Sequence, residues 1–150
     1  MAKTKLDALQ NSVWRLFITA NVKLLNCIGD KFSQAGLPTM DWYDVLLTLK
    51  EAPEHRLRLS DLAEKTLLSR SNLTHLLDRL EKAELLYRKR CPNDRRGTYA
   101  VLTEAGLEMQ QKMWAVYAAG IAEYFGNQLD EEDLKVMQRA LERMIAATCE

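Results

Sequence analysis

Residues 60–102 constrain the fold most, because the spacing of their apolar residues changes part-way along. Apolar residues first recur every three or four positions in two short stretches, which predicts two helices separated by a tight turn. The positions expected to be buried are Leu62, Ala63 and Leu67 in the first helix and Leu73, Leu76, Leu77 and Leu80 in the second. Apolar and polar residues then alternate over 86–91 and 98–102, which predicts two strands. The segment therefore predicts a helix-turn-helix followed by a β-hairpin.

The residues between these elements suit the turns that this order requires. Ser60 is placed to cap the first helix, and Ser69 or Ser71 the second, since serine side chains accept from the free N–H groups of a first turn. Residues 92–97, Pro-Asn-Asp-Arg-Arg-Gly, join the two strands and give the hairpin a basic tip. A helix fits the major groove of DNA, and an arginine at a hairpin tip fits the narrow minor groove beside it. We therefore expect this region to bind double-stranded DNA.

Long helices are predicted on both sides of this region, over residues 6–28, 39–52, 103–126 and 130–145. Residues 6–28 carry two parallel apolar stripes, where an ordinary surface helix has one. Thr39 and Asp130 are placed to cap the second and the last of these helices. A small helical lobe cannot bury both the double stripe and the stripe on 134–145, and a large exposed apolar patch is unusual in a monomer. We therefore expect a homodimer.

These patterns predict a mainly α (α+β) fold in which a winged helix-turn-helix lies between long terminal helices. Residues 1–150 are expected to form a single domain, with residues 39–103 as the DNA-binding lobe. Residues 1–36 and 104–150 are expected to supply the dimerisation helices. The net charge is zero, yet residues 68–102 carry 8 basic and 4 acidic side chains, whereas residues 103–150 carry 4 and 9. This uneven distribution favours one face that meets an anion.

Two stretches resemble the MarR (multiple antibiotic resistance regulator) family of transcription regulators. Residues 69–81, Ser-Arg-Ser-Asn-Leu-Thr-His-Leu-Leu-Asp-Arg-Leu-Glu, are similar to the recognition helix of that family. Residues 94–103 match its wing signature, in which Asp94, one further residue and Arg96 lead into a strand that ends in Leu-Thr. The resemblance covers essentially the whole chain. It implies a dimeric repressor, less often an activator, that is controlled by a small ligand, frequently an aromatic anion. Because a dimer presents two DNA-binding units, we expect its operator to be pseudo-palindromic.

The expected DNA contacts combine the polar residues of the second helix with those of the hairpin. They are Ser69, Arg70, Ser71, Asn72, Thr74, His75, Arg79, Arg88, Arg90, Asp94, Arg95 and Arg96. His75 stands where the family frequently has arginine. Glu84 stands where the family commonly has glycine, and a positive φ is unfavourable for glutamate. We therefore expect the helix to run on past this point or to end by a different turn.

The ligand that the resemblance implies calls for aromatic and basic residues near the junction of the two parts of the chain. The candidate effector-binding residues are Trp14, Arg15, Trp42 and Tyr43, with Trp114 a weaker candidate. Aromatic residues at helical spacing are more often part of a core, so each of them has an ordinary structural explanation as well. The sequence does not identify the ligand.

Other classes of function have less support in the sequence. His55 and His75 lack metal-ligand spacing, and there is no glycine-rich phosphate loop or nucleophile elbow, so we expect no enzyme, no metal site and no cofactor. Cys27, Cys91 and Cys149 fit reduced thiols. No apolar run spans a membrane and no signal peptide is evident at the start, so we expect a cytoplasmic protein. A redox-responsive regulator that uses Cys91, and a winged-helix module that binds only proteins, stay open as alternatives.

Overall fold

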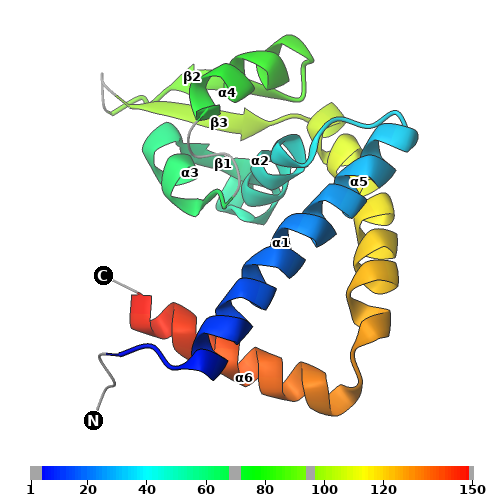
Figure 1. Ribbon diagram of the computed structural model, residues 1–150. Helices are drawn as coiled ribbons and strands as arrows, with labels where there is room; N and C mark the ends of the chain where they lie inside the picture. Colours follow the sequence, from blue (N-terminus) through cyan, green and yellow to red (C-terminus); the bar gives the residue numbers. More distant parts are fainter. Residues whose placement is uncertain (1–4, 68–71, 94–96, 149–150) are drawn as a thin grey trace. The chain divides into compact units, whose positions relative to one another are not determined.

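The computed structural model describes residues 5–67, 72–93 and 97–148. Its α-helices are α1 (Ala8–Gln34), α2 (Met40–Glu51), α3 (Leu59–Lys65), α4 (Leu73–Lys82), α5 (Glu104–Tyr124) and α6 (Glu131–Thr148) (Figure 1). Its strands are β1 (Arg56–Arg58), β2 (Leu86–Arg90) and β3 (Thr98–Leu102), and the short 3-10 turns are η1 (Pro53–His55) and η3 (Gly126–Gln128). The mainly helical winged helix-turn-helix that the sequence predicts is confirmed.

The chain divides into two compact units. The helical unit consists of Met1–Ile28 and Ala118–Glu150, and the winged unit consists of Gly29–Tyr117. The unit boundaries therefore fall inside α1 and α5. The predicted division into residues 39–103 and two terminal segments differs slightly in its bounds, and the assignment of dimerisation to the terminal segments stays a prediction.

The winged unit is built on a three-stranded antiparallel sheet with the order β1-β3-β2 (Figure 1). Leu57 of β1 and Arg88 of β2 both pair with Ala100 of the central strand. The strand β1 was missed at the sequence level, because its three residues follow a polar loop and are too few to show alternation. The core of the unit is formed by fully buried side chains from its helices and strands: Phe32, Val45, Leu46, Leu49, Leu62, Leu80, Leu86, Ala100 and Met113.

Helix caps follow the sequence in part. Asp130 caps α6 as predicted, since its carboxylate accepts from the N–H of Asp133 at 2.8 Å and Asp133 reciprocates at 3.1 Å. Thr39 occupies the N-cap position of α2, but its hydroxyl contacts the Asp41 carboxylate and not a backbone N–H. The prediction for Ser60 was wrong, because α3 begins one residue earlier and has no side-chain cap. The predicted cap of α4 by Ser69 or Ser71 lies outside the described residues.

Leu67 was expected in the core and is 85% exposed. The helix α3 ends at Lys65, so Leu67 no longer lies on its apolar face. The backbone N–H of Leu67 donates to the Asp44 carboxylate at 3.0 Å, which fixes the chain as it leaves α3. The helix-turn-helix therefore has a shorter first helix than the periodicity suggests.

The helix α4 ends in the conformation that the sequence argued against. Glu84 has φ +62°, the N–H of Leu85 donates to the carbonyl of Leu80 at 3.0 Å, and the N–H of Glu84 donates to the carbonyl of Glu81 at 2.9 Å. These two bonds define a Schellman motif, which normally has glycine at the left-handed position. The expectation that Glu84 prevents this turn was wrong: Leu80 and Leu85, at the two ends of the motif, are both buried, and their burial offsets the strain at Glu84.

A compact joint connects this turn to the start of α5. The hydroxyl of Thr103 donates to the Glu84 carbonyl at 2.8 Å and accepts from the N–H of Gly106 at 3.0 Å, while the N–H of Thr103 donates to the Leu85 carbonyl at 3.1 Å. Gly106 is required here, because a Cβ at this position would lie 2.1 Å from the Leu85 oxygen. Thr103 thus caps α5 and attaches it to the C-terminal turn of α4.

Candidate nucleic-acid interface

The helix α4 presents two different polar flanks beside one buried stripe. Leu73, Leu76, Leu77 and Leu80 form the stripe. Asn72, His75 and Arg79 are spaced three or four residues apart, so they lie together on one flank, and all three are exposed. Thr74, Asp78 and Glu81 lie on the other flank by the same spacing. The predicted contacts of this helix are therefore divided between a basic flank and an acidic one.

The basic flank suits an anionic partner. Arg79 and the hairpin residue Arg90 are exposed, and neither forms an ion pair with another described residue. Lys82 and Lys89 add two exposed cations from the same helix and the same strand. Cations without acidic partners attract phosphate groups most effectively, because no carboxylate competes for them.

Six of the predicted DNA contacts lie outside the described residues. They are Ser69, Arg70, Ser71, Asp94, Arg95 and Arg96. The residues that flank them are described. Asn72 precedes α4, and the N–H of Cys91 donates to the carbonyl of Gly97 at 3.0 Å where the hairpin loop begins. The roles of these six residues stay predictions.

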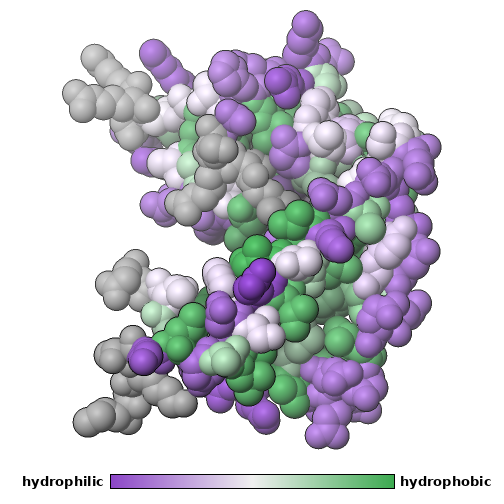
Figure 2. Space-filling model, in the orientation of Figure 1, coloured by the Kyte–Doolittle hydropathy of each residue, from purple (hydrophilic) through white to green (hydrophobic). Residues whose placement is uncertain are grey.

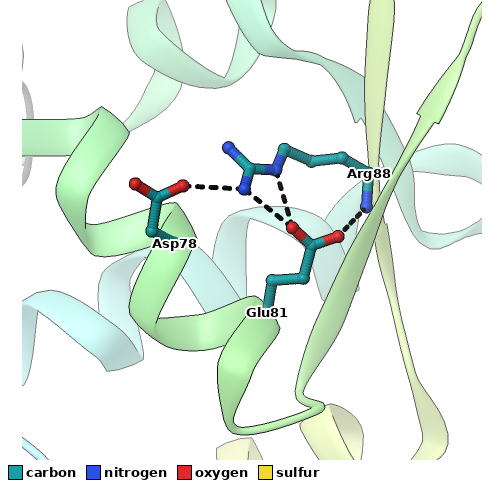
Figure 3. A network of polar contacts seen from close by, with 3 residues as sticks. All are labelled: Asp78, Glu81 and Arg88. Carbon is teal, nitrogen blue, oxygen red and sulfur yellow. Dashed lines mark hydrogen bonds and ion pairs between the residues drawn. The ribbon is translucent and has the colours of Figure 1, made fainter.

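Arg88 does not lie free on the hairpin as a DNA contact would. Its Nε donates to the Glu81 carboxylate at 2.9 Å, its Nη2 lies 2.7 Å from both Glu81 and Asp78, and its backbone N–H donates to Glu81 at 3.0 Å (Figure 3). The backbone N–H of Arg88 is the main cause that lowers the pKa of the Glu81 carboxyl, with the guanidinium adding to the effect. Both carboxylates raise the pKa of the Arg88 guanidinium. The structure thus places Arg88 in an ion-pair network between β2 and α4.

Sequence reasoning missed the acidic half of this network and one residue of α3. Asp78 and Glu81 are spaced three residues apart on a helix, with an arginine seven residues after the second, and this spacing was the available signal. Ser60 lines an open groove of about 600 Å³ between α3 and α4, which Thr74 and His75 line from the other side. Ser60 is exposed, so its hydroxyl can donate to a group that enters this groove.

The candidate effector residues fall into both units. Trp14 and Arg15 lie on α1 in the helical unit, whereas Trp42 and Tyr43 lie on α2 in the winged unit. Tyr43 is buried in an aromatic cluster with Trp114, Tyr117 and Phe32, whose neighbouring ring centroids lie 5.0–6.4 Å apart. Their assignment as a binding site stays a prediction.

One buried polar group in this cluster lacks a partner. The side-chain amide of Gln110, 2% exposed, donates to the Tyr43 hydroxyl at 3.3 Å. Its oxygen has no hydrogen-bond partner among the described residues, although a buried acceptor normally has one. Burial raises the pKa of both Tyr43 and Tyr117, so each phenol stays protonated at neutral pH.

Cys91, the candidate redox residue, is buried with 6% of its surface exposed at the end of β2. Burial disfavours direct attack of its sulfur on an oxidant, because the reactive thiolate needs access. Cys27 is half-buried, and Cys149 lies outside the described residues. Among the described residues, no helical segment combines the length and the hydrophobicity that a membrane span requires.

Comparison with known proteins identifies the family. The model of the MarR family matches residues 39–98, which include the helix-turn-helix and most of the hairpin. AbsC, a MarR family transcriptional regulator from Streptomyces coelicolor, is 35% identical to this chain and superposes with a TM-score of 0.84 over 97% of each. The chain belongs to the MarR family.

Two further transcriptional regulators are similar to this chain. Sco3205 from Streptomyces coelicolor, whose structure was determined in complex with DNA, is 29% identical over 97% of this chain and 95% of its own, with a TM-score of 0.85. The transcriptional regulator MhqR of Bacillus subtilis is 36% identical over 57% of this chain, and the chain spans only 59% of MhqR. These relatives are transcriptional regulators.

Proposed function

We propose that this MarR family protein is a transcription repressor that binds a double-stranded DNA operator as a homodimer. The observation that carries the proposal is the exposed basic flank of α4, formed by Asn72, His75 and Arg79, at the second helix of a helix-turn-helix. Sco3205, which shares this fold, was crystallised with DNA and supports the same partner. In this proposal the protein acts on DNA in the cytoplasm.

In this proposal, α4 lies in the major groove and the hairpin tip reaches the adjacent minor groove. His75 and Arg79 meet base edges or phosphates, because they lie on the flank that carries no carboxylate. Arg96 enters the minor groove and Asp94 orients it, as the wing signature implies. Arg90 contacts a phosphate at the base of the hairpin.

The dimer is proposed because the helical unit leaves a large apolar surface uncovered. Several large apolar side chains of α1 are exposed, including Leu9 and Phe17, and none of the residues of α6 is buried. Hydrophobic residues reach the surface on the face that Figure 2 shows. Leu9, Val13, Trp14, Phe17 and Met144 line an apolar groove of about 420 Å³. A second copy of the same chain covers this surface and places two winged units on one duplex, so the operator is pseudo-palindromic with half-sites about 10 bp apart or a multiple.

Selection of bound duplexes from a random pool tests the proposal and reveals the operator. We expect a pseudo-palindromic consensus, with an affinity that falls steeply as salt is raised. Arg79→Gln should weaken binding, whereas Lys135→Gln on the acidic helix α6 should not. Failure to select any sequence, with no salt-dependent binding to random DNA, would refute DNA binding and favour a module that binds only proteins.

We also propose that a small aromatic ligand releases the repressor, because the winged unit holds a buried acceptor without a partner inside an aromatic cluster. A phenol that enters beside Tyr43 can donate a hydrogen bond from its hydroxyl to the side-chain oxygen of Gln110. The test is thermal stabilisation by a panel of phenols and hydroxylated aromatic acids, repeated with Gln110→Leu, which fills the same space without polar atoms. Equal stabilisation of both proteins would show that the ligand binds elsewhere.

A further inference from the structure

We propose that Arg88 is a positioning residue, which locks the hairpin strand β2 to the recognition helix α4 and does not itself contact DNA. This inference rests on the proposed function and reassigns one of the residues expected to touch DNA. Its basis is the network of Arg88, Glu81 and Asp78, which we call the α4–β2 clamp (Figure 3).

The clamp connects two elements, α4 and β2, that would otherwise be joined only by a short turn. Only residues 83–85 separate α4 from β2, and the middle one has an unfavourable left-handed conformation. Asp78 and Glu81 lie about one turn apart at the C-terminal end of α4, and they hold Arg88 over 10 and 7 residues of sequence. Because Glu81 binds both the side chain and the backbone of Arg88, the clamp fixes the strand as well as the guanidinium.

The position of β2 at the edge of the sheet explains why the backbone contact matters. β2 pairs with β3 on one side only, since the order is β1-β3-β2. The N–H of Arg88 therefore donates to a carboxylate of α4, at 3.0 Å, where a central strand would donate to another strand. Glu81 in effect takes the place of a neighbouring strand and attaches the sheet edge to the helix.

Electrostatics argues against a phosphate contact by Arg88. Two carboxylates lie within 2.7 Å of its Nη2, so the cluster of three groups carries a net negative charge. A phosphate would have to compete with both carboxylates for donors that already have good geometry. Arg90, two residues further along the same strand, is exposed and has no such partner among the described residues. It is therefore the matched residue for comparison.

The consequence for recognition is geometric. The helix and the hairpin tip must enter neighbouring grooves at the same time, so their mutual angle has to be fixed before binding. If the clamp is broken, the hairpin samples other directions and ordering it on the DNA costs free energy. Both the affinity for the operator and the discrimination between sequences at the base pairs that the hairpin contacts should then fall.

Two substitutions separate positioning from charge, because they change the charge in opposite directions. Arg88→Gln removes a positive charge, as does the control Arg90→Gln, whereas Glu81→Gln removes a negative charge. If charge alone governed binding, Glu81→Gln would tighten it. We expect Glu81→Gln to weaken binding to the selected operator roughly three- to tenfold in the full-length protein, which corresponds to the net contribution of about one ordinary hydrogen bond.

The salt dependence and the double variant complete the DNA test. Arg88→Gln should weaken binding without changing the slope of log K against log salt, whereas Arg90→Gln should reduce that slope by about 0.9. The double variant Arg88→Gln with Glu81→Gln should bind no more weakly than either single variant, because the two changes break the same contact. Tighter binding by Glu81→Gln, or a slope for Arg88→Gln reduced as much as for Arg90→Gln, would overturn the proposal.

Amide exchange without DNA separates failure of the clamp from failure of the proposed function. In the parent protein the N–H of Arg88 should exchange slowly, and Glu81→Ala should make it exchange at least about tenfold faster while Ala100 in the central strand stays protected. Fast exchange of the Arg88 amide in the parent would overturn the clamp whether or not DNA binds. Retained protection of Ala100 shows that the variant is folded.

Discussion

Replacing Glu84 with glycine should stabilise the folded protein, although the replacement removes a side chain and raises the conformational entropy of the unfolded chain. Glu84 holds φ +62° at the left-handed position of the turn that ends α4. For a residue with a Cβ this conformation costs about 1–2 kcal/mol relative to glycine. Glycine also gives the unfolded chain more conformational freedom, which offsets about 0.4–1 kcal/mol of this gain in stability. The net expectation for Glu84→Gly is a gain of about 0.5–1 kcal/mol.

The neighbouring residue supplies a control with the opposite sign. Ala83 has φ −80°, which any residue adopts without strain, so Ala83→Gly should lose about 0.5–1 kcal/mol. The two glycine variants are therefore expected to differ by about 1–2 kcal/mol, although both change adjacent residues of the same turn. Glu84→Ala keeps the left-handed strain and should leave stability nearly unchanged, which excludes the Glu84 side chain as the source of the effect.

Urea unfolding at one fixed protein concentration measures this difference, since the stability of a dimer depends on concentration. With a slope of about 2 kcal/mol per M, the midpoints of the two glycine variants should differ by about 0.5 M or more. Equal shifts of both midpoints in the same direction would refute the reasoning. So would a gain from Glu84→Ala as large as the gain from Glu84→Gly.

Three further perturbations test other parts of the structure. Gly106→Ala should destabilise by about 2–3 kcal/mol, because its Cβ would lie 2.1 Å from the Leu85 oxygen, and an unchanged urea midpoint would contradict the joint at α5. Burial raises the pKa values of Tyr43 and Tyr117 in the folded protein above the ordinary value of 10.0. The stability that comes with these raised pKa values is complete below pH 10 and is lost as the pH rises through the folded pKa. Ultraviolet titration should show two tyrosines that ionise only as the protein unfolds. Leu9→Glu should give a monomer by light scattering, because Leu9 is 74% exposed in one chain, and an unchanged dimer would place the interface elsewhere.

The sequence by itself determined the fold class and most of the elements. The change from helical to alternating spacing located α3, α4, β2 and β3, and the predicted cap at Asp130 located the start of α6. These signals are local, since periodicity and capping depend on residues within one element. The strand β1 escaped notice, because three residues become a strand only through their partners in β3.

Only the tertiary structure decided how the residues at the candidate interface divide their roles. The sequence predicted the same DNA-binding role for Arg88 and Arg90, since both are arginines of the same strand and their partners are not visible from sequence. The fold brings Asp78 and Glu81 against the first and leaves the second exposed, because β2 turns back along one flank of α4. Glu84 is a second case: its own preference opposes the left-handed turn, and the packing of Leu80 and Leu85 overrides it. Local preferences cost about 1 kcal/mol each, so burial of neighbouring apolar side chains in the core can reverse any one of them.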